Sequence, residues 1–195
     1  VIAPVGPCSG RGHQVTTGEA FRLEARGPHR VAVHGQPADC VRAALGAILP
    51  RTSLVLSGIN AGGNLGVDVY HSGTVAAARE AVLHGVPGIA VSQYIARGRP
   101  LDWNRSARFA ALAIASLLDQ LEQPGRVWNI NLPHPADDAP DPLIVHCPWD
   151  PSPLPLTMER DADFLRYRGD YQARPRRPGH DVELCFQGAI TISAL

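Results

Sequence analysis

The sequence contains no lysine, since all 18 basic residues among its 195 are arginine. This excludes enzymes that form a Schiff base through lysine and phosphate-binding loops of the Walker type, which need one. The 18 acidic residues balance the arginines, so the formal net charge is zero. A neutral chain has no long-range field to attract a nucleic-acid polymer or an anionic membrane. We therefore expect neither as a partner.

The chain also lacks long hydrophobic runs. Glycine, arginine or histidine interrupts each apolar stretch well before the roughly 18 residues that span a bilayer, and no charged and then apolar leader opens the sequence. The four cysteines form neither a C-x-x-C pair nor a zinc-ribbon spacing. We expect reduced thiols and a soluble, cytoplasmic protein.

Short apolar runs alternate with segments of helical spacing along the first two thirds of the chain. Hydrophobic residues make up 45% of the whole, which is typical of a packed globular protein. The predicted elements are strands at 1–4, 53–57, 89–92 and 127–132, a hairpin-like pair of 21–23 with 31–33, and helices at 37–50, from Ser72 or Thr74 to 83, and 104–121. This alternation predicts an α/β fold with a mostly parallel sheet covered by helices.

The composition of the sequence changes at Pro133. Proline- and aspartate-rich segments follow, with short predicted strands near 143–145, 164–167 and 189–192. We therefore divide the chain into an α/β core over 1–132 and a β-rich extension over 133–195.

Two loops are candidates for a binding site. Ligands of open α/β sheets bind beyond the carboxyl ends of the strands, where residues 7–13 and 57–74 are expected. Ser9 and Asn60 offer neutral oxygens that suit Mg²⁺ or Mn²⁺, but these cannot hold the ion without carboxylates. The segment 72–74 opens a helix, whose N–H groups and dipole can receive phosphate. The alternative is that these residues serve only turns and caps.

Other polar residues are weaker candidates. Asp39 and Asp68 are candidate catalytic carboxylates, although Asp39 also lies in the first turn of a helix, where the dipole favours any acid. His84 is interpreted as a favourable charge at a helix C-terminus. The basic segment 174–177 is interpreted as solvated loop charge. No residue is assigned as the catalytic group.

The central motif carries a resemblance to a known family. Residues 57–66 (SGINAGGNLG), followed by 68–80 (DVYHSGTVAAARE), resemble the signature of the SurE family of stationary-phase survival proteins. Residues 35–41 are similar to the family's G-T-P-x-D-C-V, and 127–133 and 188–195 resemble two of its strands. The resemblance covers nearly the whole chain.

The SurE resemblance implies a metal-dependent phosphatase that removes phosphate from nucleoside 5′- and 3′-monophosphates. It implies a Rossmann-like, three-layer domain with a β-hairpin extension that dimerises, and we expect a homodimer or homotetramer. Ser9 and Asn60 match two metal ligands of the family, with Mg or Mn as the expected cation. The residues that match the substrate pocket are Asn64, Ser72, Gly73 and Thr74.

Two departures from the family pattern affect this interpretation. The family opens with a strand ending in N-D-D-G and a helix, whereas Val1 aligns with its second strand, and Leu195 precedes its final helix. We therefore expect the sequence as given to be N-terminally truncated and to bind a divalent cation poorly. The alternative function is a catalytically inactive, SurE-like nucleotide-binding or oligomerisation module.

Overall fold

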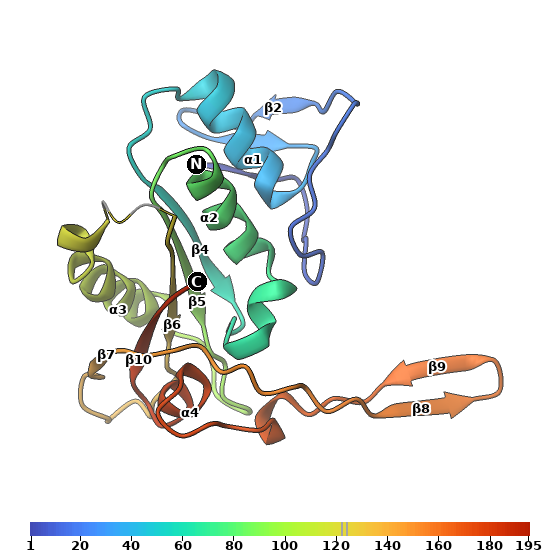
Figure 1. The fold of residues 1–195 in the computed structure, drawn as a ribbon, viewed down its shortest axis with the longest axis vertical. Coiled ribbons are helices and arrows are strands. Elements are labelled where there is room, and N and C mark those ends of the chain that lie inside the picture. The colour runs from blue at the N-terminus through green and yellow to red at the C-terminus, as the bar shows by residue number, and fades with distance from the viewer. Residues whose placement is uncertain (122, 124) are drawn as a thin grey trace.

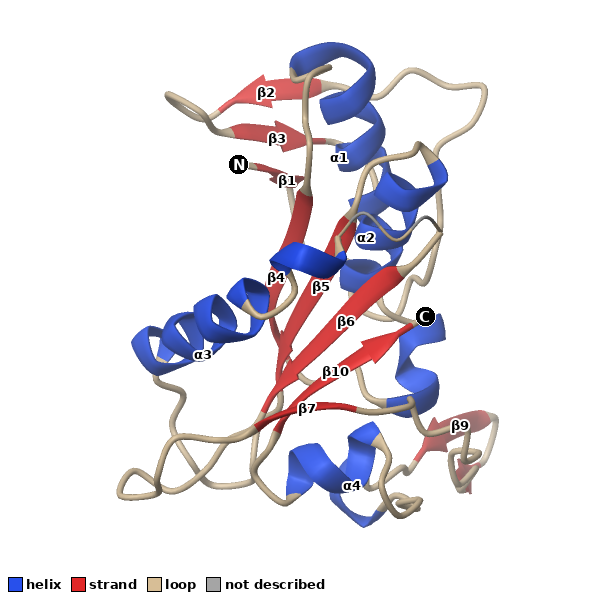
Figure 2. Ribbon diagram, turned by 60° about the vertical axis from the view of Figure 1, so that its left-hand side comes forward, coloured by secondary structure: helices blue, strands red, loops and turns tan. Residues whose placement is uncertain are grey.

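The main sheet has five strands in the order β4-β5-β6-β10-β7 (Figure 2). Its strands are β4 (Val55–Ala61), β5 (Gly88–Gln93), β6 (Val127–Leu132), β10 (Ile190–Ala194) and β7 (Ile144–His146). The first three run parallel, β10 is antiparallel to β6, and β7 is parallel to β10. The computed structural model describes residues 1–121, 123 and 125–195. The predicted α/β fold with a mostly parallel sheet is confirmed.

A second, smaller sheet lies beside the first, near α1 in Figure 2. Its strands, in the order β1-β3-β2, are β1 (Ile2–Pro4), β3 (Val31–Val33) and β2 (Leu23–Ala25). β2 and β3 are antiparallel and are joined through Gly27 and Pro28, which confirms the predicted hairpin-like pair. β1 adds to β3 in parallel.

Four α-helices occur in the described part of the chain. They are α1 (Pro37–Ala43), which continues as a π-helical turn (Ala44–Ile48), α2 (Gly73–Leu83), α3 (Trp103–Ala115) and α4 (Asp181–Phe186); 3₁₀ turns occupy Gly66–Tyr70, Leu118–Gln120 and Tyr171–Ala173. Of the two candidates from the sequence, Ser72 and Thr74, Ser72 is the N-cap of α2. None of these helices is long and apolar enough to cross a membrane.

The helices cover both faces of the main sheet, with α2 on one side and α3 on the other (Figure 2). Because neighbouring side chains of a strand point to opposite faces, Ile89 of β5 packs with Phe109 of α3, whereas Ala90 packs with Val75 of α2. Every residue of β5 and β6 is buried as a result. This explains the apolar residues of both strands, whereas the polar residues that they also contain are buried with hydrogen bonds.

The segment after Leu132 contributes to two different parts of the molecule. β7, β10 and α4 belong to the main body, and β10 lies between β6 and β7. The antiparallel hairpin of β8 (Met158–Asp161) and β9 (Phe164–Tyr167) instead projects far from the sheet (Figure 1). The division at residue 132 stays a prediction, but the strands after it do not form one separate sheet.

Some predicted boundaries differ from the structure. β4 continues to Ala61, although the sequence predicts a loop from Gly58, because Asn60 and Ala61 pair with β5 after an irregularity in the register. A Cβ atom on Gly58 would lie 2.2 Å from the carbonyl oxygen of Val91, so glycine here serves close strand packing. β8 and α4 were not predicted, and α3 ends at Ala115.

Candidate active site

A cavity of about 820 Å³ lies between β1 and β4, with α1 and the start of α2 in its wall. The two loops selected from the sequence meet here, at the carboxyl ends of β1 and β4. All six residues assigned to metal or substrate line the cavity: Ser9, Asn60, Asn64, Ser72, Gly73 and Thr74. Their positions are as expected, while the role of each stays a prediction.

The first residues of α2 present backbone donors to the cavity. Oγ of Ser72 accepts the N–H of Val75 at 3.0 Å, and its carbonyl oxygen accepts that of Ala76 at 3.0 Å. Among the described residues, the N–H groups of Gly73 and Thr74 have no acceptor. Together with the positive end of the helix dipole, these two donors suit an anion such as phosphate.

Gly73 has no room for a side chain. A Cβ atom there would lie 2.9 Å from Cγ of Pro37 and 3.5 Å from the carbonyl oxygen of Cys8. Pro37 begins α1, and Cys8 belongs to the loop after β1. Both elements therefore pack directly on the start of α2, and glycine permits that approach.

Asn60 and Ser9 offer neutral oxygens to the same cavity. Nδ2 of Asn60 donates to the carbonyl oxygen of Gly62 at 2.8 Å, which leaves Oδ1 available as an acceptor. Ser9 lies on the exposed loop after β1. Over the described ranges, no group of three or more His, Cys, Asp or Glu side chains could hold a metal ion. Two neutral oxygens do not compensate a hard divalent charge, so the described residues alone do not fit such a cation.

Asn64 is held more firmly than the other cavity residues. Its backbone N–H donates to Oδ1 of Asn131 at 2.8 Å, and its carbonyl oxygen accepts from Nδ2 of Asn129 and Asn131 at 2.9 and 3.1 Å. Its own Nδ2 donates to Oγ of Ser92 at 2.6 Å. The two asparagines of β6 thus fix the loop after β4. Their spacing of two residues in the N-I-N segment could have indicated this shared face.

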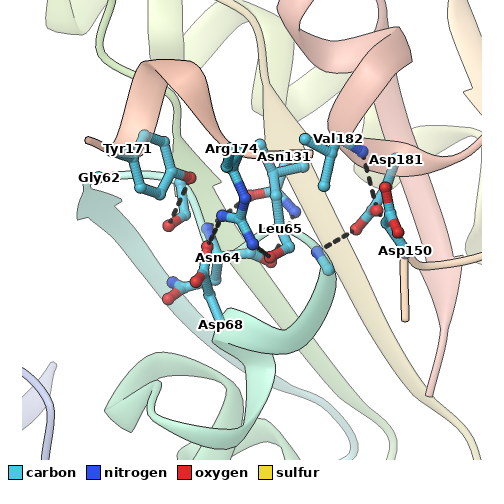
Figure 3. Close-up of polar contacts among 12 residues, drawn as sticks. Gly62, Asn64, Leu65, Asp68, Asn131, Asp150, Tyr171, Arg174, Asp181 and Val182 are labelled. Atoms are coloured by element: carbon cyan, nitrogen blue, oxygen red, sulfur yellow. Dashed lines mark hydrogen bonds and ion pairs between the residues drawn. The ribbon is translucent and has the colours of Figure 1, made fainter. Parts of the chain in front are cut away.

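Asp68 is not a free carboxylate, because it forms an ion pair with Nη1 of Arg174 (Figure 3). Nη2 of Arg174 also donates to the carbonyl oxygen of Leu65 at 3.3 Å. The guanidinium lies 5.1 Å from the ring centre of Tyr171, whose hydroxyl donates to the carbonyl oxygen of Gly63 at 3.3 Å. Interpreting Arg174 as solvated loop charge was therefore wrong, since it is only 5% exposed.

A second acid, which is buried, fixes the same loop from α4. Oδ2 of Asp181 accepts the N–H of Gly66 at 2.8 Å, and Oδ1 accepts those of Asp150 and Val182 at 2.7 and 2.8 Å (Figure 3). Burial raises the pKa of Asp181 and outweighs these hydrogen bonds, which act to lower it. Sequence reasoning missed this residue because no local pattern marks it.

Asp39 has a structural role. Its carboxylate accepts hydrogen bonds from the N–H and Oγ1 of Thr16 at 2.8 and 2.7 Å, and from the N–H of Gln36 at 2.8 Å. The side chain is fully buried and does not line the cavity. The interpretation of Asp39 as a candidate catalytic carboxylate was therefore wrong. Its side chain caps α1 and anchors the loop after β1.

Glu80 is a further buried acid that the sequence analysis did not select. Its carboxylate contacts Arg42, His13 and His84. His84 lies at the end of α2, as expected, but its partner is this side chain, and the spacing of four residues on a helix could have indicated the pair.

Comparisons with known proteins identify the family. The sequence profile described as "Survival protein SurE" matches residues 1–146. The chain belongs to the SurE family. A protein of Nostoc sp. named "Putative 5'-nucleotidase" is 46% identical over 195 residues, which are all of this chain and 86% of the relative. "5'-nucleotidase SurE" of Allorhizobium ampelinum is 42% identical over 208 aligned residues, covering the whole chain and 79% of the relative.

The fold of a solved SurE structure agrees with that of this chain. The crystal structure of the SurE protein from Aquifex aeolicus superposes with a TM-score of 0.85 at 26% sequence identity, covering all of this chain and 80% of that one. The likeness includes the segment after residue 146, beyond the profile match. The resemblance to SurE drawn from the motif at 57–80 is thereby confirmed.

Proposed function

We propose that the cavity at the start of α2 is the active site of this SurE protein. Relatives that span the whole chain carry the name 5′-nucleotidase, so the chain is a 5′-nucleotidase. In our proposal it hydrolyses nucleoside 5′-monophosphates, and also 3′-monophosphates, to nucleoside and phosphate. The observation that carries this is that Gly73 and Thr74 line the cavity and that their N–H groups have no acceptor among the described residues.

The residues around these donors suit a phosphoryl group in the same place. The hydroxyl of Ser72 already accepts one hydrogen bond from the helix, so its proton remains for a phosphate oxygen. Fixed donors at a helix start stabilise negative charge that develops during hydrolysis, because they need no reorganisation. We propose Asn64, Ser72, Gly73 and Thr74 as the substrate-binding residues.

The family resemblance implies a divalent cation, Mg or Mn, and we propose Ser9 and Asn60 as ligands to it. Among the described residues that line the cavity, the carboxylate is that of Asp68, which is paired with Arg174. The described residues therefore supply too little negative charge for a hard cation, and we derive no catalytic step through the metal.

We also propose that two copies associate through the β8–β9 hairpin, as a homodimer or within a homotetramer. Every residue of both strands is exposed, although Phe164 and Leu165 are large and apolar. Apolar side chains gathered on a projecting hairpin favour burial against another protein surface. Light scattering coupled to size-exclusion chromatography tests this proposal.

A cytoplasmic location is part of the same proposal. All four cysteines are free thiols, as expected in a reducing compartment. Burial raises the pKa of Cys40 to about 12 and that of Cys147 to about 11, so both stay protonated and unreactive at neutral pH.

The alternative drawn from the sequence, a catalytically inactive nucleotide-binding or oligomerisation module, is tested by the same assay as the nucleotidase. Phosphate release from adenosine 5′- and 3′-monophosphate, with and without added Mn²⁺, distinguishes the two functions when calorimetry is run in parallel. Turnover supports the nucleotidase. Binding without turnover supports the module, and the absence of binding contradicts both.

A further inference from the structure

We infer that His13 is a positioning residue, which holds the loop carrying Ser9 against α2 through its contact with the buried carboxylate of Glu80. The inference rests on the proposed function, because it assigns Ser9 to the active site. It adds a residue outside the cavity lining and predicts an effect on turnover that differs from the effect on substrate binding.

The loop between β1 and β2 contains no helix or strand over residues 5–22. Its position therefore depends on contacts with neighbouring elements. The N–H of Gly12 donates to the carbonyl oxygen of His71 at 3.0 Å, and Thr16 bonds Asp39 of α1. His13 adds a side-chain anchor to α2, only four residues from Ser9.

Glu80, the partner of His13, is itself held in place by burial and by two further side chains. Its side chain is 1% exposed, and a buried carboxylate needs partners to compensate its charge. Oε1 contacts Nε of Arg42 at 2.5 Å and Nε2 of His84 at 3.0 Å, whereas Oε2 contacts Nε2 of His13 at 2.7 Å. Burial acts to raise the pKa of Glu80, but the hydrogen bonds from Arg42, His13 and His84 outweigh it and hold the pKa below its ordinary range.

The same helix carries the phosphate donors. Gly73 and Glu80 are seven residues apart on α2, which is about 10 Å along the axis at 1.5 Å per residue. At the other end of this span, the carbonyl oxygen of Cys8 lies against Gly73. The loop therefore contacts α2 both beside Ser9 and at His13, and α2 sets the position of Ser9 relative to a bound phosphate.

His84 provides a matched comparison. It contacts the same carboxylate as His13, but it belongs to α2 itself and holds no loop. Removing either histidine takes one hydrogen bond from Glu80. Only the loss of His13 removes a contact between the loop and α2, so the two variants separate the positioning of Ser9 from general support of the charge cluster.

The test compares His13→Ala, His13→Gln and His84→Ala in phosphate release from adenosine 5′-monophosphate and in amide hydrogen exchange of residues 8–16. Misplacement of an active-site residue by about 1 Å can cost on the order of 100-fold in rate, so we expect His13→Ala to lower kcat by about 10- to 100-fold with KM within about twofold. We expect His13→Gln to recover most of the rate, because its amide can donate to Oε2 of Glu80. His84→Ala should keep the wild-type kcat.

Exchange in the loop should rise in His13→Ala and stay unchanged in His84→Ala. Equal effects of the two histidines, or wild-type exchange in His13→Ala, would overturn the inference. The exchange measurement needs no turnover. If the wild-type chain released no phosphate, the proposed function would fail, while exchange would still decide whether His13 holds the loop.

Discussion

The loop between β4 and α2 lies at the edge of the main sheet, whereas the β8–β9 hairpin projects far from it (Figure 1), and the protein fixes the two in opposite ways. The loop is bonded by buried side chains from β6, α4 and the segment after β9. The hairpin is held by its own strand pairing and is exposed throughout. A two-stranded hairpin is marginally stable alone. Rigid preorganisation suits a small-molecule site, whereas an exposed hairpin suits contact with another chain.

Among the substitutions that test this contrast, that of Asp181 should lower the stability of the protein most. Asp181→Ala leaves three buried N–H groups without an acceptor, and we expect a loss of about 3–5 kcal/mol in the free energy of unfolding. Urea denaturation followed by circular dichroism measures it. Asp163→Ala, at an exposed position next to β9, is the matched control. A loss below about 1 kcal/mol would contradict the view that buried side chains hold the loop rigidly.

Arg174→Ala should lower the free energy of unfolding somewhat less, by about 2–4 kcal/mol, because Asp68 keeps some contact with solvent after losing its partner. The control is Arg177→Ala, since only the backbone N–H of Arg177 bonds Asp150. Arg174→Lys should recover part of the loss, because lysine keeps the charge but not the planar fork of donors that reaches both Asp68 and Leu65. Equal stability of the Arg174 and Arg177 variants would show that the ion pair does not fix the loop.

Gly73→Ala tests the cavity end of the loop. The new Cβ would lie 2.9 Å from Pro37, so α1 and α2 must separate slightly, at a cost of about 1–2 kcal/mol. We expect nucleotide affinity to fall about tenfold, which corresponds to 1.4 kcal/mol, as measured by calorimetry. Gly46→Ala is the control, because open space surrounds Gly46. Unchanged affinity would remove the start of α2 from the binding site.

Polar substitution of the hairpin should change stability least. For Phe164→Ser with Leu165→Ser we expect the free energy of unfolding to change by less than about 0.5 kcal/mol per site, because both side chains are exposed. Our proposal that copies associate through the hairpin predicts that the same double variant is monomeric in light scattering. A stable fold that stays associated would assign the hairpin another role.

Local patterns predicted the sheet, its helices and the residues around the cavity. The boundaries of β6 and β9 agree residue by residue with the prediction, and the N-cap of α2, Ser72, is one of the two candidates that the sequence offered. These features depend on side-chain alternation, capping and a long motif, all of which are contiguous in sequence.

The residues that hold the loop could not be predicted in this way. Asp181 and Arg174 act on partners more than one hundred residues earlier in the chain, and no spacing rule links them. β4 was predicted too short for a related reason, because glycine and asparagine favour turns locally while pairing with β5 extends the strand. Tertiary contacts decided both cases.

The place of β10 has a consequence for the order of folding during synthesis. Residues 190–194 insert between β6 and β7, which were translated about 60 and 45 residues earlier. When β6 and β7 have left the ribosome, each therefore has an edge without a partner, because β10 has not yet been synthesised. Until β10 emerges, the nascent chain presents open, apolar strands of the kind that chaperones protect.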